Sequence, residues 1–268
     1  MFKIVNKIEF NSEENKMKSV ADTKTAIEIF NLNKSKNLRY LLKKRFGWMN
    51  KFINKDEVGI EFGSGAGFAK FYIKNKNFKM SDLSKDKHLD FKEVDAQATN
   101  FKDESFNYII ASNMIHHIPY PIKFFREMNR ILKKNGKLII FESYCSIIFQ
   151  LATIVMKHEG FDFTKNVWDE KDPKSDEKNA WAGNIAVPHL LFDDKQIFQK
   201  KMGNFFSIEY EKLTECLIFL NSGGVTSKTF HIPLPFFALK ILNLIDKILI
   251  KFLPNFFGMG RRIVLKKV

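Results

Sequence analysis

The stretch EFGSGAG, from Glu61 to Gly67, decides how this sequence folds. It follows an apolar run from Val58 to Phe62, a predicted strand, and precedes a predicted helix from about Phe68 to Lys74. Glycines there allow a tight turn and close contact with a ligand, and a helix amino end offers free N–H groups. A dinucleotide fingerprint would need glycine at position 68, and a Walker loop would need Gly-Lys-Ser/Thr. The stretch therefore predicts a nucleotide-type cradle of another kind.

Outward from this stretch, short apolar strands alternate with helices. The predicted strands are Phe78 to Asp82, Lys92 to Val94, Tyr108 to Ala111 and Lys137 to Phe141, with a helix from Pro121 to Lys134. Later strands are predicted at Ile208 to Phe219 and, as a final edge strand, at Arg262 to Lys267. The alternation predicts an α/β, Rossmann-like doubly wound, mostly parallel sheet with a cap or insertion.

Two carboxylates give the cradle a ligand class. Asp82 ends the second strand, where an acidic side chain can accept both hydroxyls of a ribose. Asp95 closes the third strand, where it can accept a hydrogen bond from an adenine amino group. Together with the glycine loop they predict an adenosine pocket that lacks a pyrophosphate clamp.

The order of motifs resembles a known family. EFGSGAG, MSDLS, EVDAQATNFKDESFNYIIASNMIHHI and RILKKNGKLIIFES are similar to segments of class I S-adenosylmethionine-dependent methyltransferases, within them most to the ubiquinone and menaquinone biosynthesis branch. The resemblance covers residues 57 to 143. It implies a seven-stranded sheet with an antiparallel edge strand, S-adenosyl-L-methionine as cofactor, and no metal.

The resemblance also implies roles for residues. Glu61, Gly63 and Gly65 would line the methionine end of the cofactor, Asp82 would hold the ribose, and Asp95 with Ala96 would contact the adenine. Ser112 to Met114 would edge the reaction centre. The full expected set of cofactor-binding residues is Glu61, Gly63, Ser64, Gly65, Gly67, Asp82, Leu83, Asp95, Ala96, Ser112 and Asn113.

Methyl transfer from a sulfonium is an in-line displacement that depends mainly on positioning, and it needs a base only if the acceptor loses a proton. His116 and His117, just after the fourth strand, are the candidate catalytic residues, although a purely structural or substrate-shaping role fits them too. Weaker candidates lie in the cap and are His158, Glu159, Trp168, Asp169, Trp181 and His189.

The formal charge of +14 is concentrated at the two ends of the chain. Residues 1–56 carry thirteen Lys/Arg against six Asp/Glu, and residues 236–268 carry seven against one. Either an anionic partner or solvated lysines of a biased composition would explain this pattern. Only six of the 44 basic residues are arginine, which disfavours a nucleic-acid partner.

Four regions are expected along the chain. They are an N-terminal arm with a basic amphipathic helix (1–56), a cofactor-binding core (57–143), a cap or substrate region (144–206), and C-terminal strands with an apolar insertion at about 221–260 (207–268). The two cysteines support neither a zinc knuckle nor a disulfide framework. The first twenty residues lack a signal-peptide h-region, which predicts a cytoplasmic protein.

The insertion contains the most apolar stretch, from Ile232 to Phe257. On a helical wheel, Lys240, Asp246, Lys247 and Lys251 share one side and a wide apolar arc occupies the other. Four charges disfavour a membrane span. Two interpretations stay open: an interfacial helix on the inner face of an anionic membrane, and a helix packed in the core.

The sequence therefore predicts a methyltransferase for a small-molecule, lipid or saccharide acceptor, with transfer to oxygen. An RNA methyltransferase and a catalytically inactive cofactor-binding partner protein are the alternatives. Methylation of adenine or glutamine amide nitrogen is disfavoured because no Asn-Pro-Pro-Tyr-like sequence follows the fourth strand.

Overall fold

The protein is built around one six-stranded sheet in the part of the chain that the computed structural model describes, residues 2–9, 23–31, 36–157, 159–226 and 229–268. The strand order is β3-β2-β4-β5-β8-β7. The bounds are β2 Gly59–Phe62, β3 Phe78–Ser81, β4 Phe106–Ser112, β5 Leu132–Ser143, β7 Phe206–Thr214 and β8 Gly260–Lys267. The predicted mostly parallel α/β sheet is confirmed.

The antiparallel pairing lies at one edge of the sheet, as expected. Strands β2, β3, β4 and β5 pair in parallel, and β8 runs antiparallel to both β5 and β7. The position of β8 differs in one respect from the prediction. It is second from the edge, because β7 adds one more strand outside it.

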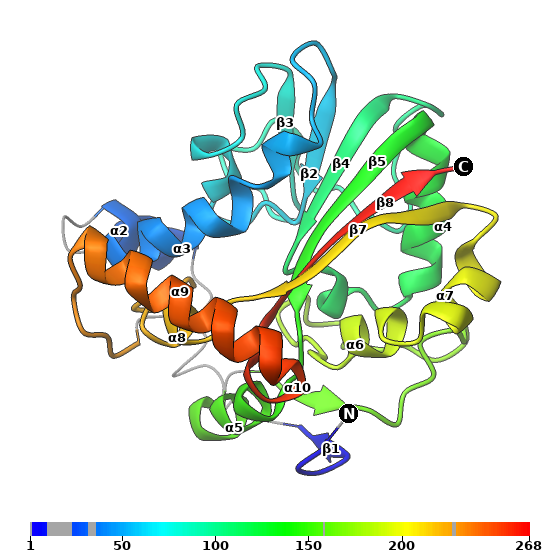
Figure 1. The fold of residues 1–268 in the computed structure, drawn as a ribbon. Coiled ribbons are helices and arrows are strands. Elements are labelled where there is room, and N and C mark those ends of the chain that lie inside the picture. The colour runs from blue at the N-terminus through cyan, green and yellow to red at the C-terminus, as the bar shows by residue number, and fades with distance from the viewer. Residues whose placement is uncertain (1, 10–22, 32–35, 158, 227–228) are drawn as a thin grey trace.

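Both faces of the central strands are buried, which explains their continuous apolar sequence. Successive residues of β4 alternate between two hydrophobic clusters, Ile109 and Ala111 in one and Tyr108 and Ile110 in the other. Helices α4 (Pro121–Ile131), α6 (Val187–Phe192) and α7 (Lys195–Met202) cover the first face, and α2 (Thr23–Asn31) and α3 (Lys36–Phe46) cover the second. Figure 1 shows α3 and α4 on opposite sides of the sheet.

The seventh strand expected at Lys92 to Val94 is not formed. Among the described residues, only an isolated bridge between Ser81 and Phe91 pairs this segment with the sheet. The chain instead folds back on the end of β3: the Asp90 and Phe91 N–H groups both donate to Met80 O, and the Val94 N–H donates to Asp82 O. The backbone of Glu93 has a φ of 54°, which is incompatible with a strand. The prediction of seven strands was therefore wrong for this segment, and the sheet has six strands.

Several predicted helices are shorter than expected. The helix after the glycine loop is a single 3-10 turn, Phe68–Phe71, and the helix from Pro121 ends at Ile131 because the chain continues directly into β5. The basic amphipathic helix predicted within residues 1–56 is divided into α3 and a 3-10 turn at Met49–Lys51. Between β2 and β4 the described chain thus contains β3 and tight turns but no α-helix.

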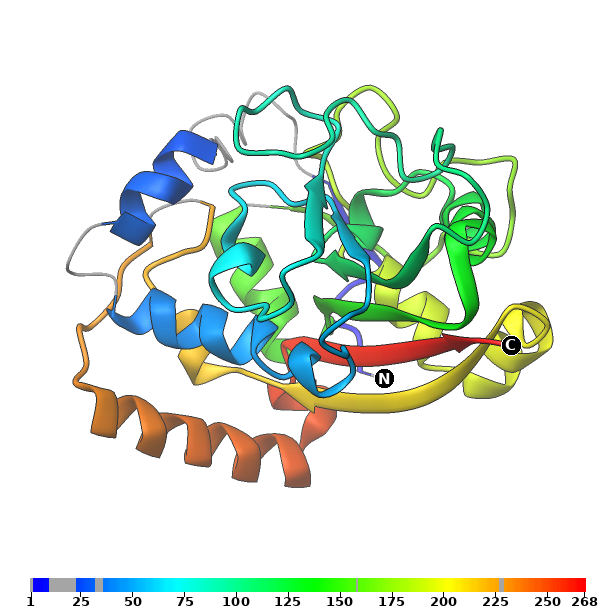
Figure 2. The same cartoon turned by 90° about the horizontal axis from the view of Figure 1, so that it is seen from above.

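The remaining elements gather at the end of the sheet where β5 stops. Helix α5 (Ile147–Met156) follows β5, and β1 (Lys7–Ile8) pairs with β6 (Phe161–Asp162). Helices α8 (Leu217–Leu220), α9 (Phe236–Phe252) and α10 (Pro254–Phe257) connect β7 to β8. Figure 2, seen from above, shows α9 along the outside of the molecule.

Candidate functional site

The glycine loop lies between the ends of β2 and β3 with three backbone turns that favour glycine. Gly63, Gly65 and Gly67 have φ angles of 66°, 48° and 71°. A Cβ atom on Gly63 would lie 2.8 Å from Met114 Cβ, whereas one on Gly65 would have no atom within 4 Å. The loop is thus packed against β4 on one side and open at Gly65.

Hydrogen bonds from β3 fix the loop. Ser81 Oγ donates to Glu61 O at 2.8 Å, and the Ser64 N–H donates to Ser81 O at 3.1 Å. The Gly65 N–H donates to Asp82 Oδ2 at 2.8 Å, and the Ser84 N–H donates to Asp82 Oδ1 at 3.0 Å. Each carboxylate oxygen of Asp82 keeps a second lone pair, so it can still accept a ligand hydroxyl.

Glu61 is a buried acid whose second oxygen has no partner. Its side chain is 2% exposed, and Oε2 is among the buried atoms without a hydrogen bond within the described residues. Burial, and secondarily the charge of Asp82, raises the pKa of Glu61 to about 8. A cationic ligand group beside this carboxyl would restore its charged form. S-adenosylmethionine carries an ammonium and a sulfonium, so the site fits this cofactor.

His88 also belongs to the loop, although the sequence analysis did not select it. His88 Nε2 lies 2.7 Å from Gly65 O, and a Cβ atom on Gly67 would come within 2.9 Å of the His88 ring. The histidine comes from the short segment after β3, which carries no motif of its own. No signal in a single sequence could have found it.

The other expected cofactor residues lie around the same ends of β3 and β4. Leu83 is 54% exposed next to Asp82, Asp95 is exposed, and Ala96 is buried. Ser112 ends β4 and is half-buried, and Asn113 follows it with a φ of 51°. The structure thus brings the glycine loop, Asp82 and the end of β4 together, and connects the Asp95 segment to Asp82 through Val94.

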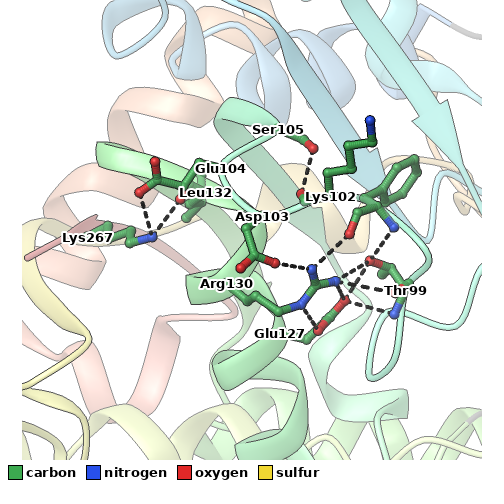
Figure 3. A network of polar contacts seen from close by, with 10 residues as sticks. Thr99, Lys102, Asp103, Glu104, Ser105, Glu127, Arg130, Leu132 and Lys267 are labelled. Carbon is green, nitrogen blue, oxygen red and sulfur yellow. Dashed lines mark hydrogen bonds and ion pairs between the residues drawn. The ribbon is translucent and has the colours of Figure 1, made fainter.

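A network centred on Arg130 of α4 holds residues 99–103, in the segment between β3 and β4 (Figure 3). Arg130 donates to Phe101 O at 2.8 Å and to Asp103 Oδ1 at 2.6 Å. Its other guanidinium nitrogens donate to Glu127, which also accepts from the Thr99 N–H at 2.8 Å and from Thr99 Oγ1 at 2.6 Å. Side-chain hydrogen bonds from α4 therefore fix residues 99–103, which have no backbone pairing with a neighbouring strand among the described residues.

His116 and His117 lie in a 3-10 turn, Ile115–His117, directly after β4. His116 Nδ1 is 2.7 Å from Glu142 Oε2, and its Nε2 is 3.3 Å from Glu159 Oε2. His117 Nε2 is 3.6 Å from Glu159 Oε1. Burial alone would lower the pKa of His116, but the neighbouring Glu142 and Glu159 carboxylates raise it to about 10. His116 is thus held as an imidazolium, unsuited to accepting a proton at neutral pH.

This histidine cluster is connected to the glycine loop. Glu142 Oε1 accepts from the Met114 N–H at 2.8 Å and from the Ile115 N–H at 2.6 Å, and Met114 is the residue that packs against Gly63. Glu142 lies one residue beyond the strand predicted at Lys137 to Phe141, and no motif or spacing in the sequence marks it as part of a site.

The weaker candidates from the cap are mostly structural. Trp168 packs against Phe198, Asp169 accepts from the Lys171 N–H, and His189 lies 2.9 Å from Asp193. Trp181 is 50% exposed, and His158 lies outside the described residues. Of the members of this group that the structure describes, only Glu159 joins the cluster.

Comparison with known proteins agrees with this geometry. Residues 60–140 match the family described as "Methyltransferase domain". An S-adenosylmethionine-dependent methyltransferase from Thermotoga maritima superposes with a TM-score of 0.51 at 16% identity, covering 92% of this chain and 98% of that one. One from Archaeoglobus fulgidus gives 0.50 at 14% identity, covering 85% and 94%. No curated protein sequence matches the chain.

The solved structures support the fold, and the domain match together with the site supports the activity. Residues 60–140 form a methyltransferase domain, so the chain is a methyltransferase, and the glycine loop with Asp82 and the buried Glu61 fits S-adenosylmethionine as its cofactor. In the part of the chain that the structure describes, no helix is both long and apolar enough to cross a membrane.

Proposed function

We propose that the enzyme methylates an oxygen of a lipid-like acceptor, of the quinol or lipid-linked kind, while bound to an anionic membrane surface. The observation that carries this proposal is the outward apolar face of α9. Its residues Phe237, Ile241, Leu244, Ile248 and Phe252 are between 49% and 71% exposed. The buried side of the helix is instead formed by Leu239, Asp246 and Ile250.

The orientation of α9 is set by Asp246. This buried carboxylate accepts from the N–H groups of Cys216, Leu217 and Ile218 at 2.8–3.2 Å, at the amino end of α8. Because the acid points inward, the apolar arc points outward. The arrangement favours the interfacial interpretation over a helix packed in the core.

Positive charge borders this apolar face. Lys240, Lys247 and Lys251 are exposed on one flank of α9, and their aliphatic stems can lie along the apolar residues. Burial, followed by the charge of Lys247 and of three other basic groups, holds the pKa of Lys44 of α3 below its usual value. The two basic ends of the chain therefore meet at α9, which complements an anionic lipid surface.

An apolar pocket lies beside this face. It has a volume of about 420 Å³ and is lined by Phe2 and Ile147 and by the residues from Phe252 to Phe256. The pocket includes Ile147, the first residue of α5. Ile147 follows Glu142, the β5 residue that contacts His116, by five positions in the sequence. This position supports a site for the apolar part of an acceptor.

We assign the cofactor to the ends of β2, β3 and β4. Glu61 would pair with its ammonium, Gly63, Ser64, Gly65 and Gly67 would line it, and Asp82 with Leu83 would contact the ribose side. Asp95 and Ala96 would contact the adenine, beside a pocket of about 400 Å³ that Phe91, Val94 and Phe101 also line. Ser112 and Asn113 would border the transferred methyl group.

When bound, S-adenosylmethionine supplies a methyl group on a positively charged sulfur. In the transfer the sulfur–carbon bond breaks, the sulfur keeps the electron pair, and the acceptor oxygen forms the new bond and loses its proton. We assign that proton to His117 and Glu159, because their side chains are partly exposed whereas His116 is held between two carboxylates. His116 is then a positioning residue.

Vesicle binding tests the membrane part of the proposal. The protein should sediment with vesicles that contain phosphatidylglycerol and much less with phosphatidylcholine alone. Ile248→Glu should lower this binding about tenfold or more, since it places a charge in the apolar face. Ile197→Glu is the matched control, because Ile197 is 42% exposed on α7, away from α9 (Figure 1). Equal binding of the two variants would contradict the proposal.

Methyl-labelled cofactor tests the acceptor. Label should pass from the cofactor into an extracted membrane lipid in a form that resists alkaline hydrolysis, as an O-methyl ether does. Label in RNA would favour the RNA alternative. Cofactor binding without transfer to lipid, saccharide or RNA would favour the inactive partner protein.

A further inference from the structure

Two adjacent histidines after β4 and a glutamate from the cap bring their donor atoms close together. His116 Nε2 and His117 Nε2 lie 3.3 and 3.6 Å from the two oxygens of Glu159. One donor atom from each of the three residues lies within 4.8 Å of the others. We infer that His116, His117 and Glu159 form a binding site for a divalent transition-metal ion, for which Zn²⁺ fits the donors well.

The spacing of the donors favours a shared ion over direct ion pairs. Charge-assisted hydrogen bonds between nitrogen and oxygen are about 2.7–2.9 Å long. Neighbouring donors around a tetrahedral Zn²⁺, each about 2.0–2.2 Å from the ion, are about 3.3–3.6 Å apart. The two contacts involve different oxygens of Glu159, and each has this longer spacing, whereas the contact of His116 with Glu142 has the length of a hydrogen bond at 2.7 Å.

Glu142 completes the arrangement expected around a metal-binding histidine. Such a histidine usually donates its second ring N–H to a carboxylate, which fixes the ring and its tautomer. Glu142 is fully buried and accepts from His116 Nδ1, which leaves Nε2 facing Glu159. A bound ion would take the place of the proton that Nε2 carries in the ion-free protein. The carboxylate itself is anchored by the backbone N–H groups of Met114 and Ile115.

Hydrogen bonds to the backbone carbonyl groups of the two histidines fix their positions against the cap. The Asn184 N–H donates to His116 O at 2.8 Å, and Ser175 Oγ donates to His117 O at 2.7 Å. A Cβ atom on Gly183 would come within 2.7 Å of the His116 ring and 2.9 Å of the His117 ring. The cap is therefore fitted closely to both rings before any ion binds.

The donor set selects the class of ion. Mg²⁺ and Ca²⁺ prefer sites made of oxygen donors, whereas two imidazoles with one carboxylate suit Zn²⁺ and its transition-metal neighbours. A divalent charge would balance the carboxylates of Glu142 and Glu159. Three protein donors also leave a coordination position open, as in catalytic zinc sites.

This inference rests on the proposed function and deepens it. An ion held by the three side chains would bind the acceptor oxygen at its open coordination position and lower the pKa of that oxygen, so that its proton passes to solvent. His117 and Glu159 accept the proton themselves only in the ion-free protein. Its consequence for specificity is that the acceptor presents a hydroxyl or phenolic oxygen to the cluster. Metal binding itself can be measured without any acceptor.

The test is metal binding to the untagged full-length protein after chelator treatment. Titration with Zn²⁺ should show one tight equivalent, and Co²⁺ should give visible absorption bands of a low-symmetry site. Glu159→Gln and His117→Ala should each weaken binding about 100-fold, and Glu142→Gln about 10- to 100-fold. Glu177→Gln is the matched control, since Glu177 lies in the same cap and bonds Tyr120 instead.

Retention of tight Zn²⁺ binding by both Glu159→Gln and His117→Ala would overturn the inference, as would the absence of binding to the folded wild-type protein. Circular dichroism on each variant establishes that it is folded. Vesicle binding is measured on the metal-free protein, so failure of the metal site and failure of the membrane proposal give different results.

Discussion

At the scale of single residues, we expect the buried carboxyl group of Glu61 to contribute most to binding of the cationic cofactor. It is a carboxyl group without a counter-charge, buried under the loop that we assign to a cationic cofactor. Its burial costs stability in the free enzyme whenever the group is ionised. The same unpaired carboxylate that destabilises the free enzyme favours binding of a positively charged ligand.

The stability of the cofactor-free protein should therefore depend on Glu61 and pH. Because burial raises the folded pKa of Glu61 to about 8 from its ordinary 4.5, its contribution is complete below pH 4.5 and is lost as the pH rises through 8. Glu61→Gln should thus flatten the decline of thermal stability between pH 4.5 and pH 8. Thermal unfolding of both proteins across this range is the measurement, and parallel declines would contradict the expectation.

Cofactor binding should also release protons. A cationic group next to Glu61 lowers its pKa, so that a largely protonated carboxyl at pH 7 becomes ionised on binding. Calorimetric titration in two buffers with different ionisation enthalpies should show release of a substantial fraction of one proton. Glu61→Gln should abolish this buffer dependence and weaken binding, and an unchanged dependence would exclude Glu61 as the source.

At the scale of elements, the irregular segment between β3 and β4 depends on side chains of α4. Arg130→Met removes the donors to Phe101 O and Asp103 and leaves Glu127 half-satisfied (Figure 3). We expect a loss of about 1–3 kcal/mol in the free energy of unfolding and weaker cofactor binding through the Asp95 segment. Urea unfolding and calorimetry check both effects.

Arg126→Met is the control for this prediction. Arg126 lies on the same helix and pairs with Glu170 on the surface, where such a pair contributes about 0–1 kcal/mol. If the Arg126 and Arg130 variants lose the same stability and bind the cofactor equally, α4 does not hold the segment as we describe.

The orientation of α9 depends on one buried side chain. Asp246→Ala leaves three N–H groups at the start of α8 without their acceptor, so we expect a loss of about 2–4 kcal/mol in the free energy of unfolding. Asn243→Ala, on the same helix and half-buried, should cost much less. Chemical denaturation compares the two, and similar costs would show that Asp246 does not anchor the helix.

At the scale of the whole molecule, the elements that the sequence predicts correctly are those whose pattern lies within one short stretch of chain. The run from Val58 to Gly67 defines β2 and its turn, and the run from Lys137 to Phe141 lies within β5, because burial on both faces gives a continuous apolar pattern. The sheet and the glycine loop were predictable for this reason.

The remaining features depend on contacts between distant segments. Glu142 and Glu159 meet the two histidines only in the folded chain, and Arg130 reaches residues 99–103 from α4. The strand predicted at Lys92 to Val94 is absent because the backbone there bonds to the end of β3. A helical wheel gives the apolar arc of α9 but not its direction, which a single hydrogen-bonded acid decides. The residues that make these contacts are far apart in the sequence, and no periodic pattern or fixed spacing marks them.

The central claim is that S-adenosylmethionine binds between the glycine loop and Asp82, and calorimetric titration tests it most directly. The wild-type protein should bind S-adenosylmethionine and S-adenosylhomocysteine with dissociation constants on the order of micromolar, and should not bind NAD. Asp82→Ala should weaken binding about 10- to 100-fold, whereas Asp86→Ala in the same segment should not. Absence of binding to both compounds, or equal binding by the Asp82 variant, would contradict the claim.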